Sequence, residues 1–387
     1  MGGAEMSEWK KVKLGDICNR VTSGGTPKAN VESFYSPPTI PWLKTKEVNY
    51  SRIYETENYI SEDGLANSSA KMIVPNSVII AMYGQGDTAG RVAINKIPLT
   101  TNQACCNLTF DDKKANYEFV YYQLCTLYDK MVSLKSGAAQ PNLNAQIIKG
   151  LEILLPSLTT QNQIATILSR YDSLIENYQK QIKLLEEAAQ RLYKEWFVDL
   201  HFPDHENTKI VDGVPECWEK KKVGDIVPIK TGKKDANFGT PDGAYPFFTC
   251  SQEPIKAPSY SFDANAVILA GNGDFNVKLY RGKFEAYQRT YVLEPNNPSM
   301  LYLLFFCISE NMNKLATGAS GSTIKFLTKG MIDSLEMLVP IETIVARFNQ
   351  YIESIQSEKE RIHSQIRLLI ESRDRLLPKL MSGEIAI

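Results

Sequence analysis

The sequence has no apolar run near the ~20 residues that a membrane-spanning helix requires. Its first residues, MGGAEMSEWKKVKLGD, lack the apolar core of a signal peptide. We therefore expect a cytoplasmic protein with no membrane segment. A length of 387 residues, 43% hydrophobic and 22% charged, is long for a single core and favours two globular domains.

Paired metal-binding motifs and an excess of one charge are also missing. The seven cysteines are odd in number and form no pair of CxxC motifs, which indicates reduced thiols and argues against a zinc site. A net charge of −1 excludes a broadly basic clamp for nucleic acid. It leaves room for a selective reader that carries its positive charge on loops.

Catalytic motifs are missing as well. There is no GxxxxGK[ST] loop, no Asn-Pro-Pro-aromatic or Asp-Pro-Pro-aromatic tetrapeptide, and only three histidines. Asp204 and Glu206, before Lys209, are interpreted as a solvated connector. The glycine-rich stretches at 83–90 and 270–275 are interpreted as turns that need positive φ, because they occupy equivalent places in a repeat. We expect a chain with no catalytic residues, no metal and no cofactor of its own.

An internal repeat is the main feature that is present. WKKVKLGDIC at 9–18 returns as WEKKKVGDIV at 218–227, and QIKLLEEAAQRL at 181–192 returns as QIRLLIESRDRL at 365–376. Between these lie four shorter matches: 22–24 with 230–232, 77–86 with 266–275, 136–144 with 317–325, and 151–157 with 335–341. The order is kept while the offset drifts from 209 to 184, which indicates two copies of a domain followed by a helix.

Each globular part has the pattern of a mixed α/β (α+β) domain. Short β-branched or aromatic runs at 78–81, 267–269 and 289–293 predict strands, and 118–127 and 300–307 predict helices. The expected boundaries are 1–157 for the first domain, 158–199 for the first long helix, 200–341 for the second domain and 342–387 for the second long helix.

Each long helix carries an apolar seam. The first begins after Pro156, where Thr160 and Gln163 suggest a capping box, and the second begins after Pro340. The seam residues recur at alternating steps of four and three, which is typical of helices that supercoil on a partner. They are Ile164, Leu168, Tyr171, Ile175, Tyr178, Ile182, Leu185, Leu192, Phe348, Ile352, Ile355, Ile362, Ile366, Leu369 and Leu376.

Two such seams in one chain predict an antiparallel coiled coil with pseudo-twofold symmetry. Each helix of ~37 residues would span ~55 Å. Lys359 and Arg373 interrupt the second seam, and polar breaks of this kind commonly fix the register. The alternative is that each helix packs only on its own domain.

Polar residues on equivalent loops are the candidates for contacts with DNA. Lysine and arginine neutralise phosphates, and glutamine, asparagine and arginine can pair with base edges. The candidates in the first domain are Lys44, Lys46, Tyr83, Gln85, Arg91, Lys135 and Asn142. Those in the second are Lys230, Lys233, Lys234, Asn272, Lys278, Arg281 and Lys325. Asn102 and Gln103 are left out because their side chains can equally hold a turn.

Six segments make the chain resemble the specificity subunit of Type I restriction–modification systems. They are TSGGTPK (22–28), IPWLKT (40–45), AMYG (81–84), TTNQACC (100–106), LPSLTTQNQIA (155–165) and RLLPKLMSGEI (375–385). The resemblance covers essentially the whole chain and is clearer in the first half. The second domain departs from it, with QRTYVL where the first has NQACCNL.

The resemblance implies a non-catalytic subunit that reads a bipartite site in double-stranded DNA. Each domain would recognise one half-site, and the paired helices would set the gap between them. Two methyltransferase (modification) subunits would dock and flip an adenine for N6 methylation, and restriction/translocase subunits would join them. S-adenosylmethionine, ATP and Mg would be bound by those partners.

Two other hypotheses compete with this one. A coiled-coil scaffold would use the same globular domains to bind proteins or glycans. A self-contained methyltransferase would bind S-adenosylmethionine through one of the glycine-rich stretches.

Overall fold

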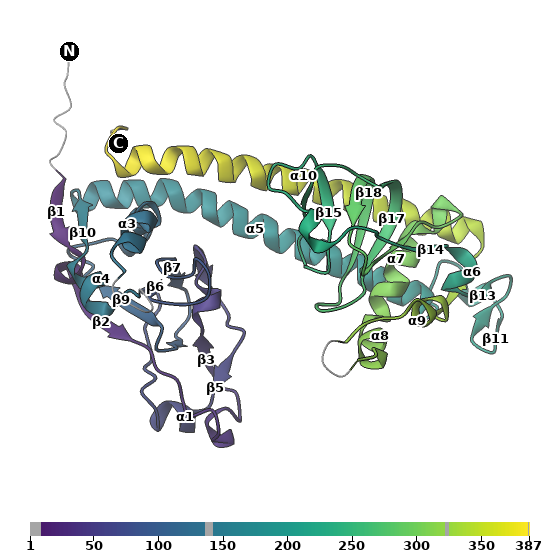
Figure 1. The fold of residues 1–387 in the computed structure, drawn as a ribbon, viewed down its shortest axis with the longest axis horizontal. Coiled ribbons are helices and arrows are strands. Elements are labelled where there is room, and N and C mark those ends of the chain that lie inside the picture. The colour runs from purple at the N-terminus through teal and green to yellow at the C-terminus, as the bar shows by residue number, and fades with distance from the viewer. Residues whose placement is uncertain (1–8, 136–141, 322–324, 386) are drawn as a thin grey trace, which may run out of the picture. The chain divides into compact units, whose positions relative to one another are not determined.

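The computed structural model describes residues 9–135, 142–321, 325–385 and 387. The chain divides into two compact units: unit 1 comprises Met1–Asn177 and Gln365–Ile387, and unit 2 comprises Tyr178–Ser364. Two long helices, α5 (Leu158–Phe197) and α10 (Glu342–Met381), each contribute a segment to both units (Figure 1). Both units are mixed α/β, as the sequence predicts.

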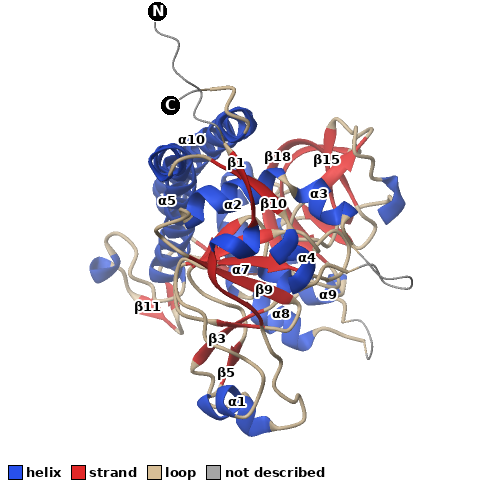
Figure 2. Ribbon diagram, turned by 90° about the vertical axis from the view of Figure 1, so that its left-hand side faces the viewer, coloured by secondary structure: helices blue, strands red, loops and turns tan. Residues whose placement is uncertain are grey.

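Unit 1 is built on a five-stranded sheet with the order β2-β9-β6-β7-β4, beside a three-stranded sheet β5-β3-β8 and a two-stranded sheet β1-β10. In Figures 1 and 2 the segment that contains β3, β5 and α1 extends away from the five-stranded sheet. The elements are β1 (Lys10–Lys13), β2 (Cys18–Ser23), β3 (Ile40–Leu43), β4 (Ser51–Ile53), β5 (Tyr59–Ile60), α1 (Glu62–Ala66), β6 (Val78–Ala81), β7 (Val92–Asn95), β8 (Thr100–Thr101), β9 (Cys105–Phe110), α2 (Tyr117–Thr126), α3 (Tyr128–Ser133), α4 (Ala145–Gly150) and β10 (Glu152–Leu155).

The centre of this sheet is apolar on both faces. Strands β6 (VIIA) and β7 (VAIN) are fully buried, as expected for short continuous runs of β-branched residues. The Asn116 side chain caps α2 by accepting hydrogen bonds from the backbone N–H groups of Glu118 (2.9 Å) and Phe119 (3.0 Å). Helix α2 buries Phe119 and Tyr122 in the core.

Unit 2 is built on a six-stranded sheet with the order β14-β19-β17-β18-β15-β16. Its first four strands follow the order of β2-β9-β6-β7 in unit 1. The elements are β11 (Ile210–Val211), β12 (Val214–Pro215), β13 (Glu219–Lys222), α6 (Val223–Ile226), β14 (Ile229–Thr231), β15 (Tyr245–Phe248), β16 (Ile255–Ala257), β17 (Phe262–Ala270), β18 (Val277–Ala286), β19 (Thr290–Leu293), α7 (Leu301–Glu310), α8 (Met312–Gly318), α9 (Lys329–Asp333) and β20 (Glu336–Val339).

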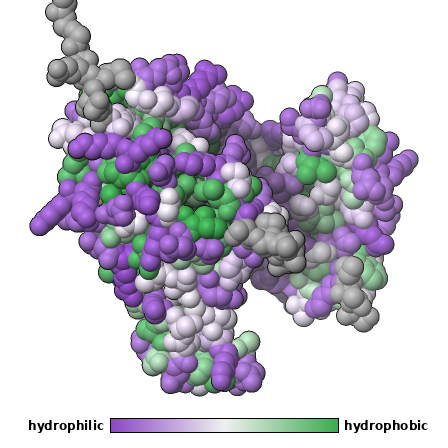
Figure 3. All heavy atoms as spheres, turned by 60° about the vertical axis from the view of Figure 1, so that its left-hand side comes forward, coloured by the Kyte–Doolittle hydropathy of each residue, from purple (hydrophilic) through white to green (hydrophobic). Residues whose placement is uncertain are grey.

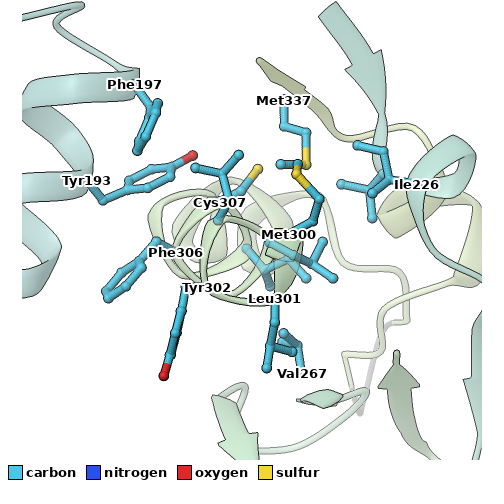
Figure 4. Close-up of a cluster of buried hydrophobic side chains, with 14 of the residues drawn as sticks. Tyr193, Phe197, Ile226, Val267, Met300, Leu301, Tyr302, Phe306, Cys307 and Met337 are labelled. Atoms are coloured by element: carbon cyan, nitrogen blue, oxygen red, sulfur yellow. The ribbon is translucent and has the colours of Figure 1, made fainter. Parts of the chain in front are cut away.

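Helix α7 lies at the centre of the unit 2 core (Figure 4). Tyr193 and Phe197 from α5 lie on one side of it, and Ile226, Val267 and Met337 from α6, β17 and β20 lie on others. The sequence predicts this element, because LYLLFFCISE is apolar nearly all round and such a helix is buried.

Equivalent backbone hydrogen bonds confirm the internal repeat. The Leu14 N–H donates to the Leu151 carbonyl (2.9 Å), and the Val223 N–H donates to the Leu335 carbonyl (2.8 Å). Strands β1 and β10 pair in unit 1 as β13 and β20 pair in unit 2.

One match within the repeat is displaced from its predicted register. The Leu143 N–H donates to the Met82 carbonyl (3.0 Å), and in unit 2 the Leu327 N–H donates to the Gly271 carbonyl (2.8 Å). Leu143 therefore corresponds to Leu327, whereas matching 136–144 with 317–325 would assign it to 324. The weak similarity of these loops did not fix the alignment, whereas the backbone contacts do.

The first long helix begins at Leu158, and the predicted capping box is wrong. The Ser157 hydroxyl accepts the backbone N–H of Thr160 at 3.2 Å, so Ser157 caps the helix and Thr160 lies inside it. Both residue types suit the position, and the sequence pattern alone did not separate them.

The two long helices contact each other in both units. In unit 1, Leu168 of α5 and Leu380 of α10 belong to one apolar core. In unit 2, Phe348 of α10 is fully buried and packs on Phe197 of α5, with 4.9 Å between the ring centroids. The antiparallel pairing expected from the sequence is therefore present.

Every predicted seam residue is buried or half-buried, whereas Leu184 and Leu368, outside the seam, are 62% and 57% exposed. The alternative, that each helix packs only on its own domain, is wrong, although each helix also packs on a globular domain. The start of α5 packs on the sheet domain of unit 1, and the start of α10 packs on that of unit 2.

Candidate nucleic-acid interface

The β6–β7 connection of unit 1 is a polar loop at the end of a buried hairpin. The Gly90 N–H donates to the Ala81 carbonyl (2.8 Å), and the Thr88 hydroxyl donates to the Gln85 carbonyl (2.6 Å). Gly86 and Gly90 have positive φ values of 61° and 97°, so this stretch is a turn of the kind that the glycines indicated. The turn leaves Gln85 exposed at its tip.

Arg91 lies at the base of this loop in a cluster of polar groups. Its guanidinium contacts the Asp87 carboxylate (2.6 Å) and the Asn49 amide oxygen (3.0 Å). The hydrogen bond from Arg91 lowers the pKa of Asp87, and the charge of Lys135 lowers it further. Asp87 therefore lies close to Arg91 and Lys135, two of the residues predicted to contact DNA. The two cations outnumber this one carboxylate at the base of the loop.

Five of the seven candidates in unit 1 gather around this loop. Tyr83, Gln85 and Arg91 belong to it, Lys135 acts on Asp87, and Asn142 precedes Leu143, which is bonded to the strand end at Met82. Tyr83 is half-buried against the core.

Lys44 and Lys46 lie on the connection from β3 to β4. The Lys44 ammonium donates to the Asn58 side chain (2.9 Å) and lies over the Trp42 ring. Lys46 forms an exposed ion pair with Glu57 (3.2 Å). Both residues have acceptors within their own unit, which hold the ammonium groups near this connection.

The loop after β17 in unit 2 corresponds to the loop after β6. Asn272 forms a β-bridge with Phe326, which places Lys325 beside this loop, and Gly273 has a positive φ of 69°. The Lys278 ammonium donates to the Ser251 carbonyl (2.9 Å) and to the Asn276 side chain. Burial lowers the pKa of Lys278. Asn272 and Lys325 are thus brought together, whereas Lys278 lines a hollow with Glu253, Phe305 and Lys359.

The remaining candidates in unit 2 lie elsewhere. Lys230 pairs with Glu294 (3.3 Å), Lys233 is exposed, and Lys234 lies over the Phe238 ring. Arg281 lies within the β17–β18 ladder and donates to the Tyr302 hydroxyl (2.7 Å) of α7. The structure therefore separates Arg281 from the loop residues.

Sequence reasoning missed Arg289, which is exposed next to the same loop. The Gly271 N–H donates to the Arg289 carbonyl (2.8 Å), as the Met82 N–H donates to the Ala104 carbonyl (2.7 Å) in unit 1. A cation in unit 2 therefore replaces a buried alanine of unit 1. Aligning the glutamines of NQACC and QRTYV would have identified this position.

Gln103 has the turn-holding contact that led to its omission. Its side-chain oxygen accepts a hydrogen bond from the Thr26 hydroxyl. The Asn102 side-chain oxygen likewise accepts a hydrogen bond from the Cys105 thiol (3.3 Å). Both contacts lie within unit 1 and stabilise its TTNQACC segment.

Residues 9–135, 142–321 and 325–385 contain no cluster of three or more His, Cys, Asp or Glu side chains suited to a metal ion. Across the same residues, no helix is both long and apolar enough to cross a membrane.

Two similar mixed α/β domains, each with cations and amides on corresponding loops and each packed on paired long helices, define a tandem-repeat recognition protein. The chain belongs to the family of the Type I restriction modification DNA specificity domain, which matches residues 6–187 and 215–368. The chain is 26% identical to the Type I restriction enzyme MjaIX specificity subunit of Methanocaldococcus jannaschii, over 98% of this chain and 94% of that one.

One further relative and one solved structure are similar to this chain. The Type I restriction enzyme EcoDI specificity subunit of Escherichia coli is 36% identical over 44% of this chain and 39% of its own length. The crystal structure of the Type I restriction-modification system S subunit from M. genitalium shares the fold, with a TM-score of 0.57, 15% identity and 98% of both chains covered.

Proposed function

We propose that this chain is the DNA-specificity subunit of a Type I restriction–modification complex, and that each globular domain reads one half of a bipartite target. The observation that carries the proposal is that two loops have equivalent backbone hydrogen bonds but different side chains. Loops 83–90 and 272–276 follow equivalent strands and are anchored by equivalent backbone bonds, yet they share few side chains. Different side chains on equivalent backbone positions are suited to the recognition of two different DNA sequences.

The chemistry of the loop residues supports this role. Arg91 is held by a carboxylate and an amide, and the same guanidinium can bind a phosphate or the O6 and N7 atoms of guanine. Gln85 and Asn272 carry side-chain amides that can pair with adenine. Lys135, Lys325 and the exposed Arg289 would neutralise phosphates.

The proposal assigns catalysis and cofactors to other subunits. Two methyltransferase subunits would bind S-adenosylmethionine, and restriction/translocase subunits would bind ATP and Mg. This chain would be a non-catalytic component of the complex in the cytoplasm.

Sequencing of methylated adenines in DNA from cells that carry the complete system tests the proposal. We expect one motif with two specified halves separated by unspecified bases. Q85A/R91A should relax the half read by unit 1, and N272A/R289A the half read by unit 2, because a lost bidentate pair costs about 1–3 kcal/mol of discrimination. K113A, an exposed lysine outside these loops, is the matched control.

Methylation without a bipartite motif would contradict the proposal. So would a motif that neither double variant alters.

A further inference from the structure

Unit 1 has a hollow of about 400 Å³ away from the β6–β7 loop residues named above. Strands β1 and β10, helices α2 and α3, and the C-terminal end of α10 line it. Lys11, Lys130 and Glu152 supply its charged groups, and Leu154 and Met381 are among its apolar groups.

Unit 2 has a hollow of about 380 Å³ at the equivalent place. Strands β13 and β20, helices α7 and α8, and the C-terminal end of α5 contribute its lining. Lys220, Lys314 and Glu336 supply charged groups there, and Leu338 and Phe197 are among its apolar groups. Each of these residues is the repeat equivalent of the one named in unit 1, because β1 corresponds to β13, α3 to α8, β10 to β20, and α10 to α5.

Three charged groups are common to the two hollows, although all are exposed and the surrounding core does not require them; unit 2 adds Glu310 where unit 1 has Thr126. Lysine is kept at 11 and 220 and at 130 and 314, and glutamate is kept at 152 and 336. The loops proposed to read DNA differ between the units. Two lysines and a glutamate that stay constant between two diverged halves are suited to one ligand that binds twice.

The lysines of each hollow are placed to meet an acceptor. In unit 2 the Lys220 ammonium lies 2.7 Å from the Glu336 carboxylate, and the charges of Lys220 and Lys314 both lower the pKa of that carboxyl. In unit 1 the Lys130 ammonium donates to the Glu152 backbone carbonyl (3.1 Å). Strands β1 (KKVK) and β13 (EKKK) add exposed lysines next to each hollow.

We propose that each hollow docks the same acidic segment of the modification subunit, one copy per unit. A carboxylate of the segment would lie between the two lysines, and a neighbouring apolar side chain would rest on Leu154 in unit 1 and on Leu338 in unit 2. The inference deepens the proposed function and rests on it. Two identical partners suit like surfaces, whereas the bases of two unlike half-sites require unlike ones. Each hollow also presents apolar groups beside its lysines, which a phosphate backbone would leave uncovered, so we assign the partner as a protein rather than DNA.

Native mass spectrometry of the full chain with the modification subunit of its own system tests this inference. We expect two copies on the wild-type chain, one copy on K11E/K130E, one on K220E/K314E, and none on the fourfold variant at a concentration that saturates the wild type. Titration should give a dissociation constant for each altered site about tenfold or more above the wild-type value, because like charges then face each other.

Matched controls reverse exposed lysines outside the hollows: K71E/K113E in unit 1 and K209E/K256E in unit 2. They should keep two copies. Circular dichroism and thermal melting of all variants should match the wild type, since the changed side chains are exposed.

Retention of two copies by the fourfold variant overturns the inference, as does a wild-type chain that binds fewer than two. L184A/L368A changes two exposed positions of the long helices. If this variant loses both copies while the lysine-to-glutamate variants keep them, the modification subunits dock on the helices and the inference fails. Weaker binding of random-sequence duplex with two copies retained identifies the lysines as phosphate contacts and overturns it too. A wild-type complex that holds two modification subunits but methylates no bipartite motif would refute the proposed recognition of DNA. The docking of the two subunits in the hollows would still stand.

Discussion

Arg373 of α10 and Asp172 of α5 form an ion pair across the two long helices, with 2.7 Å between Nη1 and Oδ1. Asp172 also accepts the Tyr122 hydroxyl of α2 (2.5 Å) and lies 3.9 Å from the guanidinium of Arg52 on β4. One carboxylate thus joins both helices to the sheet domain of unit 1. In unit 2, Lys359 pairs with Glu186 (2.6 Å) in the same antiparallel sense, so both polar interruptions of the α10 seam meet an acid of α5.

Replacing Asp172 by alanine should destabilise the protein. Arg52 has a side chain only 4% exposed. Burial alone would lower its pKa, but the neighbouring Tyr122, Asp172 and Glu118 outweigh that effect and raise it. Without Asp172, the buried Arg52 and the half-buried Arg373 each lose an anionic neighbour, at a cost of about 3–5 kcal/mol. Urea denaturation followed by circular dichroism measures the change.

The control for this prediction is E358A, which removes an ion pair with Arg361 on the exposed face of α10. It should have little effect, because exposed pairs contribute little. Equal effects of D172A and E358A would show that the Asp172 contacts do not stabilise unit 1.

Substituting Gly24 or Gly232 by alanine should also destabilise the chain. These residues occupy equivalent turns, and an added Cβ would lie 2.2 Å from the Thr101 carbonyl oxygen and 2.0 Å from that of Ala286. Backbone atoms cannot move aside as a flexible side chain can, so we expect a loss of about 2 kcal/mol or more. Thermal denaturation of G24A and G232A measures it.

The matched substitution is G330A in helix α9, where an added Cβ meets nothing within 4 Å. Alanine is the better helix former, so this variant should be as stable as the wild type or more stable by up to about 1 kcal/mol. If G24A and G232A were as stable as G330A, the short distance from each turn to the neighbouring backbone carbonyl would not limit the stability of the chain.

The repeat, the fold class and the helix pairing could be predicted from the sequence because each leaves a periodic or repeated signal. Seam residues such as Leu168 and Phe348 recur at 3.5-residue spacing, which requires a partner surface. Leu184 and Leu368 match in the repeat as well, yet they are exposed because they fall outside the seam. Identity between repeats therefore did not identify the core, whereas spacing did.

Contacts between polar groups far apart in the chain could not be predicted. Arg52 has no feature that connects it to Asp172 or Glu176 in the sequence, because an ion pair needs only two groups at the right place and leaves no period. The sequence predicts Arg281 on a DNA-contacting loop, whereas it lies within β18, and its hydrogen bond to Tyr302 depends on how β18 packs against α7. Arg289 was missed because the equivalent residue of unit 1 is Ala104, a buried residue with no polar group to suggest a contact with DNA.

Reactivity of the cysteines should follow their burial. Cys217 is exposed, whereas Cys105, Cys106 and Cys307 are buried. Burial raises the pKa of Cys106 to about 12 and that of Cys307 to about 11. Iodoacetamide at pH 8 should therefore label Cys217 and spare these three, as peptide mass spectrometry can show. Labelling of Cys307 at the rate of Cys217 would contradict the packing around α7.

The raised pKa of Cys307 also predicts how stability depends on pH. The thiol ionises near pH 8.5 in the unfolded chain and near 11 in the folded one, so the folded state holds its proton more tightly in between. Its contribution is complete below about pH 8.5 and is lost as the pH rises towards 11. Urea midpoints at pH 8, 9.5 and 10.5 should fall more steeply for the wild type than for C307A. Parallel curves would show that this thiol does not couple to folding.

A fragment of residues 1–200 should form a symmetric dimer, because it keeps the α5 seam and loses α10. Helices α5 and α10 are both 40 residues long and equivalent in the repeat, so a second copy of α5 can take the place of α10. In that dimer Asp172 would face Ala189 of the other copy, the equivalent of Arg373. We therefore expect weak, concentration-dependent association, and A189R should tighten it about tenfold by forming two Arg–Asp pairs.

Sedimentation velocity over a range of protein concentrations measures this association, and A188R, one position outside the seam, is the control. The gain from A189R should shrink as the salt concentration rises, since ion pairs at a surface are screened. If A189R and A188R dimerised equally, the helices would not share the register set by Arg373 and Asp172. A strictly monomeric fragment would show that the α5 seam does not pair with a copy of itself.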